Sequence, residues 1–348
     1  MMSPASSKHY AEDVLRSFLN EKLQIAKTIH PSYANLIEEI HRVTFAGGKR
    51  LRPHLVFIGY GHYDAAIATV AAAHELLHFS LLIHDDIIDR DDIRHDQATI
   101  HSSYNAGYYS KIASDIDRLH FSTSAALIAG DVLLSAAHEL LATAPLSSQQ
   151  HKVASSILSK GVFEVAGGQL LDTEAPYFQD TLDPLLIYRY KTAGYSFIAP
   201  LMTGVAFSPK NHSQTTLDHV RDFATNLGIA YQIRDDTLGT FGDTAHTGKS
   251  TISDLREGKQ TLLIDIFKRK ASQQDMSEFE QSFGKADASP KDLESLKQCI
   301  EQSGALHEVR AVELSYKQAA LAAITKIDDN ELRADLTAFV DYIDGRIK

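Results

Sequence analysis

Hydrophobic residues recur at helical spacing along most of the chain. In segment 11–26, Val14, Leu15, Phe18 and Leu19 return at intervals of three and four between charged residues, the pattern of a helix with one buried face. The same pattern predicts helices over 33–45, 54–93 (one or two, with a break near 59–66), 121–144, 150–172, 184–207, 215–239, 261–271, 291–301 and 305–343. Strict alternation is scarce and no convincing hairpin signal occurs, so the predicted fold class is all-α.

The chain shows no sign of division into domains. No Gly/Ser linker and no block of charge interrupts the helical pattern, which predicts one domain over residues 8–348 after a disordered N-terminus, residues 1–7. The polar, Tyr-rich stretch 102–120 is predicted to be a surface excursion of mixed structure.

Composition narrows the functional class. The 348 residues are 44% hydrophobic, which excludes global disorder, and the net charge of -11 argues against nucleic-acid binding through overall basicity. The single Cys299 fits a reducing cytoplasm. The N-terminus has no apolar run of signal-peptide length, and segment 122–144 is too weakly apolar for a spanning helix. We therefore expect a cytoplasmic protein without a transmembrane segment.

An acidic cluster follows an apolar helix at residues 80–92, SLLIHDDIIDRDD. On a helix, Asp85 and Asp89 lie about 40° apart on one face, whereas Asp86 points aside. Two carboxylates one turn apart can bind a hard cation, chiefly Mg²⁺. A solvated acidic helix end is the alternative for this motif alone.

A second acidic cluster favours metal binding over a solvated helix end. The stretch 228–243, GIAYQIRDDTLGTFGD, places Asp235 and Asp236 at the end of another apolar helix, with Asp243 further along. Bundles commonly build metal sites from facing helices, and Mg²⁺ prefers to be shared with substrate phosphates. The two clusters together predict a diphosphate held through metal ions.

Cationic residues accompany the acidic clusters. The stretch 46–54, AGGKRLRPH, supplies Lys49, Arg50 and Arg52, and its glycines let the backbone come close to a ligand. Further candidates follow at Arg94, Lys191, Lys249 and Lys259. An acidic chain with such clusters is typical of anion binding through metals and cations together.

These residues resemble the trans-isoprenyl diphosphate synthases, also called polyprenyl synthetases. The resemblance covers residues 50–265 and lies in GGKRLRP at 47–53, ELLHFSLLIHDDIID at 75–89, GDVLL at 130–134, GGQLLD at 167–172, YKTA at 190–193, YQIRDD at 231–236 and SDLREGKQT at 253–261. It implies an isoprenoid-synthase bundle around a deep cavity, usually homodimeric. It also implies Mg²⁺-dependent, head-to-tail condensation of isopentenyl diphosphate with an allylic diphosphate.

The resemblance also implies roles for individual residues. Two or three Mg²⁺ ions would bind at Asp85, Asp89 and Asp235, which with Lys191 form the catalytic set. Isopentenyl diphosphate would be held by Lys49, Arg52, His78 and His95. The allylic diphosphate would be held by Arg94, Gln169, Lys191, Thr192, Gln232, Lys249 and Lys259. Gln169 and Asp172 would line the reaction centre.

Three features depart from the family pattern, one of which is the excursion at 102–120, longer than the usual connector. His95 and Asp96 stand where arginine and glycine are common, so His95 carries less charge at neutral pH. Gly239 stands where the second cluster often has a third aspartate.

Product length depends on bulk before Asp85. Helical geometry indicates Leu77 and Leu81 as the residues that limit product length. The family pattern instead indicates Ser80, which is small. Ser80 predicts a geranylgeranyl or longer product.

Other readings stay open. The product could be of farnesyl length, the chain could be a regulatory subunit of a heteromeric synthase, or it could be a class I terpene cyclase. Both aspartate pairs are present, against the regulatory reading, and a cyclase would leave Lys49, Arg52 and His78 without a role.

Overall fold

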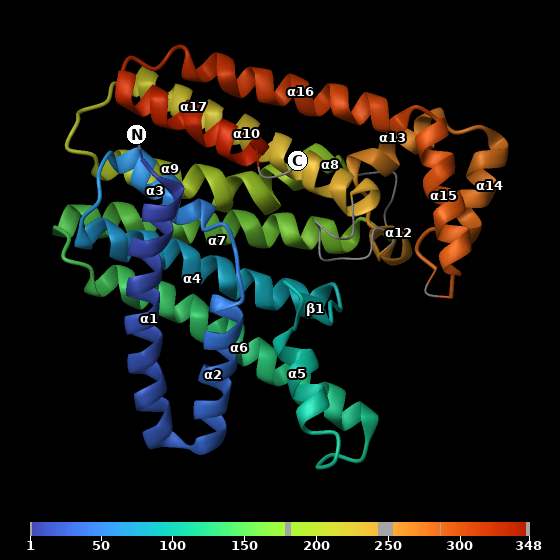
Figure 1. Cartoon of the computed structure of the whole chain (residues 1–348), viewed down its shortest axis with the longest axis horizontal. Helices are drawn as coiled ribbons and strands as arrows, with labels where there is room; N and C mark the ends of the chain where they lie inside the picture. Colours follow the sequence, from blue (N-terminus) through green and yellow to red (C-terminus); the bar gives the residue numbers. More distant parts are fainter. Residues whose placement is uncertain (1, 178–181, 243–252, 286, 346–348) are drawn as a thin grey trace. The chain divides into compact units, whose positions relative to one another are not determined.

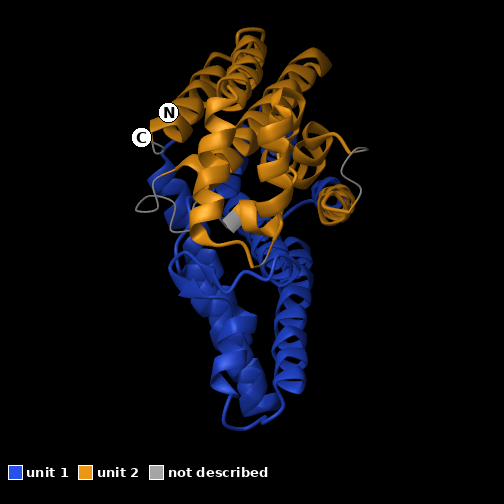
Figure 2. Ribbon diagram, turned by 90° about the vertical axis from the view of Figure 1, so that its right-hand side faces the viewer, with its two compact units in different colours: residues 1–158, 200–211 blue, residues 159–199, 212–348 orange. Residues whose placement is uncertain are grey.

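The computed structural model describes residues 2–177, 182–242, 253–285 and 287–345 (Figure 1). Within these residues the chain is helical apart from one short hairpin, which confirms the all-α class. The chain divides into two compact units, residues 1–158 with 200–211 and residues 159–199 with 212–348 (Figure 2). One domain over 8–348 stays a prediction.

The first unit is built around one apolar helix, α4. Its elements are α1 (Pro4–Ile29), α2 (Pro31–Phe45), α3 (Leu51–Tyr60), α4 (Ala65–Ile88), β1 (Ile93–Arg94), β2 (Gln97–Ala98), α5 (Ile100–Gly107) and α6 (Asp115–Thr143), followed by the start of α7 (Ser148–Glu174) and most of α9 (Ala199–Phe207). Residues 70–77 of α4 are all buried. Such all-round burial marks a central core helix.

The N-terminus differs from the expectation that residues 1–7 are disordered. Helix α1 begins at Pro4, a residue whose fixed φ suits the first helical turn. Ser7 is fully buried, and its Oγ lies 2.8 Å from Nδ1 of His54 and 3.2 Å from the hydroxyl of Tyr63. These contacts anchor a segment that periodicity alone could not place.

Helices α4 and α6 pack closely because α6 carries a glycine at the contact. A Cβ on Gly130 would lie 2.2 Å from Nε2 of His84. The imidazole of His84 also lies 3.4 Å from the carbonyl oxygen of Leu127 and 3.6 Å from Oδ1 of Asp131. Gly130 thus makes room for the side chain that precedes the first acidic pair.

A two-residue hairpin follows α4, although the sequence shows no convincing hairpin signal. Ile93 pairs with Ala98 and Arg94 with Gln97. The turn residues His95 and Asp96 both have positive φ, 50° and 58°, as a type I′ turn requires. Neither is glycine, which explains why the turn was missed.

The second unit has its own core. Its elements are the rest of α7, α8 (Pro184–Ile187), η1 (Tyr188–Ile198), α10 (Gln214–Phe241), α12 (Ser253–Glu257), α13 (Leu262–Lys270), α14 (Gln273–Ser282), α15 (Pro290–Gln302), α16 (Ala305–Ile324) and α17 (Asn330–Gly345). Side chains from α10, α13, α15 and α16 form one buried cluster that includes Ile233, Phe267, Leu296 and Val309. The predicted segment 305–343 is two helices, separated by residues 325–329.

Segment 188–198 is a π-helix, where the sequence predicts an ordinary helix over 184–207. Such helices are rare and often lie at functional sites. Backbone close approach accompanies this one: a Cβ on Gly168 of α7 would lie 2.3 Å from the backbone nitrogen of Lys191.

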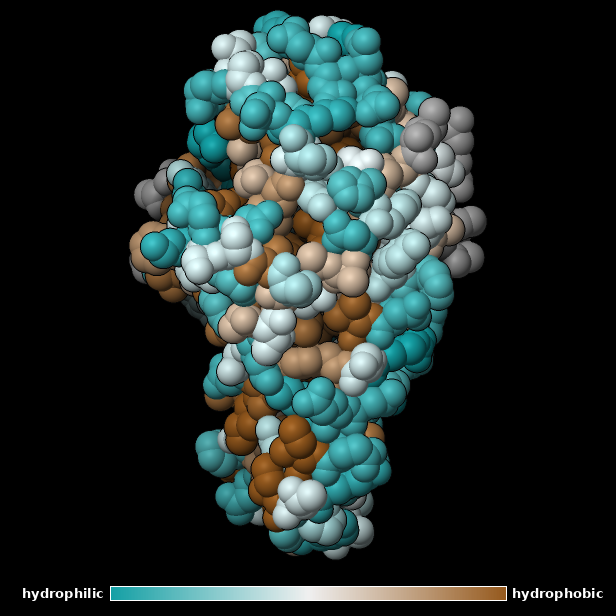
Figure 3. Space-filling model, turned by 90° about the vertical axis from the view of Figure 1, so that its left-hand side faces the viewer, coloured by the Kyte–Doolittle hydropathy of each residue, from teal (hydrophilic) through white to brown (hydrophobic). Residues whose placement is uncertain are grey.

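Two helices, α4 and α6, are long and apolar enough to cross a membrane by length and composition alone. The most apolar window of α4 is 72% buried inside the protein and that of α6 is 50% buried, as core helices of a folded protein are. Figure 3 shows one face of the molecule, the left-hand side of Figure 1, on which hydrophobic residues gather in patches between hydrophilic ones. The absence of a transmembrane segment stays a prediction.

Candidate active site

The first group of candidate residues lies at the C-terminal end of α4. Asp89 caps the helix, and its N–H donates to the carbonyl oxygen of Asp85 at 2.8 Å. The side chain of Asp85 is 21% exposed and that of Asp86 only 8% exposed. The structure therefore separates the doubled aspartate into one accessible carboxylate and one turned into the protein, as helical geometry predicts.

Arg94, on the hairpin, contacts three of these carboxylates. Its Nε donates to Oδ1 of Asp86 at 2.5 Å, and its Nη2 lies 3.5 Å from Asp85 and 3.4 Å from Asp91. Burial lowers the pKa of Arg94, but the charges of Asp86 and Asp85 more than offset this and raise it above its ordinary value. Arg94 is thus a fixed cation within the acidic cluster, suited to a diphosphate drawn there by metal ions.

The basic loop before α3 divides its cations between structure and site. Gly47 and Gly48 have φ of 157° and 109°, a backbone that other residues rarely adopt. Arg50 is buried, and its guanidinium contacts Glu12 at 2.9 Å and Glu75 at 3.3 Å and donates to the carbonyl oxygen of Thr44 at 2.7 Å. Arg50 is therefore structural.

A cationic cluster surrounds His78, three residues before Leu81 on α4. Burial, followed by the charges of Arg52 and Arg94, lowers the pKa of His78 well below its ordinary value. Arg50 and His95 contribute to the same effect. Arg52 and His95 are thus close enough to act on His78 electrostatically, and a neutral His78 imidazole can donate a hydrogen bond but supplies no charge. Lys49 lies in the loop directly before α3, and Arg52 is the second residue of that helix.

A second group of candidate residues lies on α10, in the second unit. Asp236 is held by two donors: the hydroxyl of Tyr188 at 2.5 Å and the amide of Gln232 at 2.7 Å. The Tyr188 hydroxyl accepts from the backbone N–H of Leu262 at 2.9 Å. Burial raises the pKa of Asp236 to about 7, although the Tyr188 hydrogen bond lowers it. Asp236 is thus an anchor, which leaves Asp235 as the candidate metal ligand.

Helix η1 contributes two predicted substrate residues to this second group. The hydroxyl of Thr192 donates to Oε1 of Gln232 at 2.7 Å, and Nζ of Lys191 is ion-paired with Asp172. Gln169 lies one turn before Thr173 on α7, and its Nε2 is buried without a hydrogen-bond partner. The structure therefore pairs Lys191 with Asp172 and Thr192 with Gln232, through two neighbouring residues of η1.

Lys259 lies close to a carboxylate that the sequence does not single out. Its Nζ is 3.7 Å from Oδ1 of Asp254 and 3.6 Å from Oε2 of Glu257. Lys249 and Asp243 lie outside the described residues.

Ser80 and Leu77, two of the predicted chain-length residues, are buried, with exposed fractions of 0% and 1%. The hydroxyl of Ser80 has no hydrogen-bond partner. Leu81 is half-buried and lies about 40° from Asp85 around the helix. The side chain of Ser80 is enclosed by its neighbours. That Ser80 leaves the end of the product cavity open therefore stays a prediction.

The donor set fits Mg²⁺ rather than a transition metal. Among the described residues, no three His, Cys, Asp or Glu side chains converge to cage a metal ion. The candidates at Asp85, Asp89 and Asp235 are carboxylates, which Mg²⁺ shares with waters and substrate phosphates.

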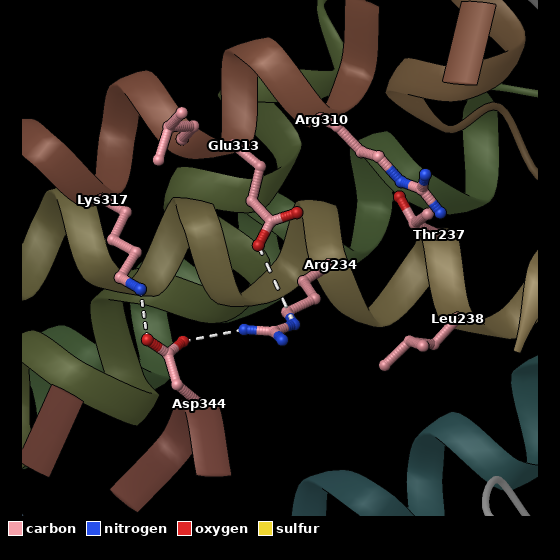
Figure 4. A pocket seen from close by; sticks show the side chains of 8 residues that line it. Arg234, Thr237, Leu238, Arg310, Glu313, Lys317 and Asp344 are labelled. Atoms are coloured by element: carbon pink, nitrogen blue, oxygen red, sulfur yellow. Dashed lines mark hydrogen bonds and ion pairs between the residues drawn. The ribbon is translucent and has the colours of Figure 1, made fainter. Parts of the chain in front are cut away.

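A pocket of about 540 Å³ lies beside α10, between α16 and α17. In Figure 4, Arg234 and Lys317 both point to Asp344, and Nη1 of Arg234 lies 2.8 Å from its carboxylate. Arg234 lies about 160° around α10 from Gln232 and Asp236. The pocket therefore lies on a different face of α10 from Gln232 and Asp236.

Sequence reasoning missed three residues of the site. No feature of the sequence marks Tyr188 as a partner of Asp236. Asp254 lies in the quoted stretch SDLREGKQT but was given no role there, although a Cβ on Gly239 would lie 2.3 Å from its Oδ2. The third residue, Asp236, was grouped with Asp235 as an acidic side chain, and its role as a buried anchor was not predicted.

Comparison with known proteins shows to which family the chain is similar. Residues 34–302 match the family model of polyprenyl synthetases. The chain is 32% identical to the geranylfarnesyl diphosphate synthase of Aeropyrum pernix over 315 residues, 87% of this chain and 92% of the relative. It is 30% identical to the geranylgeranyl diphosphate synthase of Sulfolobus acidocaldarius over 318 residues, 87% and 89% of the two chains.

A solved structure is also similar. The geranylgeranyl pyrophosphate synthase of Corynebacterium glutamicum, in complex with isoprenyl diphosphate and magnesium, matches with a TM-score of 0.90 and 30% identity over 98% of each chain. With the acidic helix ends and the cations around them, these matches show that the chain belongs to the polyprenyl synthetase family of trans-prenyltransferases.

Proposed function

We propose that this trans-prenyltransferase joins isopentenyl diphosphate to an allylic diphosphate and makes a geranylgeranyl or longer product. One observation carries the proposal: Asp85 near the end of α4 and Asp89 at its C-cap lie one helical turn apart, and the charges of Arg52 and Arg94 act on His78 of the same helix. A carboxylate pair suits a metal-bound diphosphate, and cations beside the pair suit a second diphosphate. A terpene cyclase needs only the first.

The residues support a mechanism without a side-chain nucleophile. Magnesium, when bound, would neutralise negative charge on the departing diphosphate. Arg94, Lys191 and Lys259 would hold that diphosphate with charges already in place, which stabilises the leaving group as the carbon–oxygen bond breaks. We propose that Asp235 acts on the same diphosphate as Asp85 and Asp89, through two or three ions. Released diphosphate would accept the final proton.

His78 and the basic loop would hold the acceptor substrate. His78, neutral at working pH, would donate a hydrogen bond to isopentenyl diphosphate, while Lys49 and Arg52 would supply charge. The replacement of an arginine by His95 is expected to raise the KM for isopentenyl diphosphate.

A direct assay tests the function. Purified protein with Mg²⁺, isopentenyl diphosphate and each allylic primer in turn should extend the primer, with product lengths measured by chromatography. Product from geranyl diphosphate without isopentenyl diphosphate would instead identify a cyclase. No turnover by the purified chain alone would favour a regulatory subunit.

Product length has its own test, at Ser80. Ser80→Phe is expected to shorten the product because the added ring closes the space one turn before Asp85, at a stability cost of about 1–3 kcal/mol for overpacking. Leu81→Phe tests the position that helical angles favour. Ser80→Ala, which removes only the unpartnered hydroxyl, is the matched control and should leave the product unchanged. An unchanged distribution in both Phe variants places the floor elsewhere.

We also propose a cytoplasmic homodimer. Helix α6 exposes apolar side chains that a partner subunit could cover: Ile116 is 81%, Leu119 56%, Leu127 50% and Ile128 49% exposed. Light scattering coupled to size exclusion would give the mass. A monomer at micromolar concentration would contradict the dimer.

A further inference from the structure

Residue 239 on α10 has no side chain, and the space for one is filled. A Cβ on Gly239 would lie 2.3 Å from Oδ2 of Asp254 and 3.4 Å from its Cγ. Any side chain there would have to displace the carboxylate. The Asp254 carboxylate therefore occupies the place in which residue 239 would carry its own functional group.

That place has a counterpart in the first acidic cluster. Residues 235 and 239 are one helical turn apart on one face of α10, as Asp85 and Asp89 are on α4. In α4 both positions carry carboxylates, and in α10 only Asp235 does. Asp254 thus brings a carboxylate to the α10 position that corresponds to Asp89.

Several contacts hold Asp254 at this position. Its Oδ1 lies 3.7 Å from Nζ of Lys259, and its carbonyl oxygen accepts from the backbone N–H of Lys259 at 3.1 Å. Its side chain is 16% exposed, so it is neither a free surface acid nor fully enclosed. Its charge also acts on Asp236, whose pKa it helps to raise.

We propose that Asp254 supplies the second carboxylate of the α10 magnesium site, in the space that Gly239 leaves open. The inference rests on the proposed prenyltransferase function, because it concerns Mg²⁺ bound together with diphosphate. A carboxylate at this distance acts on the ion directly or through one of the waters that Mg²⁺ retains. Lys259 would be held beside the same diphosphate.

Binding of inorganic diphosphate at increasing Mg²⁺ concentration, followed by isothermal titration calorimetry, tests the role without turnover. Asp254→Ala is expected to raise the Mg²⁺ concentration at half-maximal binding about tenfold, the lower end of the effect of removing a supporting group at a metal. In the double variant Gly239→Asp/Asp254→Ala, the new aspartate has the vacated space, and the midpoint should return toward that of the unchanged protein. Gly239→Asp alone should lower the Tm, because both carboxylates compete for one space.

Two further variants complete the experiment. Asp265→Ala is the matched control, since Asp265 on α13 is a half-exposed residue paired with Arg269 at 3.2 Å and should leave the midpoint unchanged. If Asp254→Ala does not fold, Asp254→Asn, which keeps the shape and removes the charge, should show the same tenfold weakening.

The possible results distinguish a failure of the Asp254 proposal from a failure of the proposed prenyltransferase function. An unchanged midpoint in Asp254→Ala or Asp254→Asn overturns the inference alone. So does a double variant that stays as weak as Asp254→Ala, because Asp254 would then act only by restraining Lys259. Failure of the unchanged protein to bind diphosphate with Mg²⁺ would overturn the proposed function, and the inference with it.

Discussion

At the scale of single residues, neighbours of the same type have different roles. Asp85 and Asp86 are adjacent acids, yet one is accessible and the other is the closest partner of Arg94, at 2.5 Å. Lys49, Arg50 and Arg52 are read together as cations, yet Arg50 is used internally, against Glu12 and Glu75. Burial and partners decide which charge is available to a ligand.

The aspartate pair provides a prediction at this scale. Asp85→Ala should lower kcat by on the order of 10²–10³-fold, because it removes a group that acts on charge developing in the transition state, and should leave the Tm nearly unchanged. Asp86→Ala should instead lower stability by about 1–3 kcal/mol, since it leaves the Arg94 guanidinium without its closest partner. Steady-state kinetics and thermal denaturation of both variants would separate the roles. Equal losses of kcat with equal Tm would contradict the division.

At the scale of elements, glycine positions set how closely helices approach. Gly130 admits the imidazole of His84 between α4 and α6, and Gly168 admits the backbone of η1 against α7. The second contact brings η1 close enough to α7 for Lys191 to pair with Asp172. Close backbone approach therefore positions a lysine that we propose binds the allylic diphosphate.

The adjacent glycines of α7 form a matched pair for testing this. Gly168→Ala places a Cβ 2.3 Å from the backbone nitrogen of Lys191, so it should destabilise the protein by about 1–3 kcal/mol and raise the KM for the allylic substrate. Gly167→Ala meets nothing within 4 Å and should be neutral or stabilising by up to about 1 kcal/mol through helix propensity. Thermal denaturation and kinetics would measure both. A similar effect of the two substitutions would rule out the packing explanation.

At the scale of the whole molecule, buried histidines link stability to pH. Burial lowers the pKa of His54 to about 4 and that of His74 to about 3. Both are in the core, where His54 contacts Ser7 and Nε2 of His74 lies 3.1 Å from the hydroxyl of Thr203. Each is neutral in the folded protein and takes up a proton more readily in the unfolded chain.

The sign of the pH effect follows. Because the folded pKa values are below the unfolded value of 6.5, the stabilisation is present above pH 6.5 and is lost as the pH falls toward 4 and 3. For His54 alone the loss is at most about 3 kcal/mol. His54→Gln should show a shallower fall of Tm between pH 6.5 and 4, with His138→Gln on the surface as control. Parallel Tm profiles for all three proteins would contradict this.

The sequence alone determined the helical class, the two acidic clusters, the cations around them and the family, because periodicity, residue type and motif spacing are local properties of the chain. The tertiary structure decided that Arg50 and Asp236 are internal anchors, that Tyr188 holds Asp236, and that Asp254 fills the space beside Gly239. Such roles depend on which atoms from distant segments share a buried space. Hydrogen-bond geometry, desolvation and steric exclusion are set only when the helices pack, so no pattern of residue types along the chain specifies them.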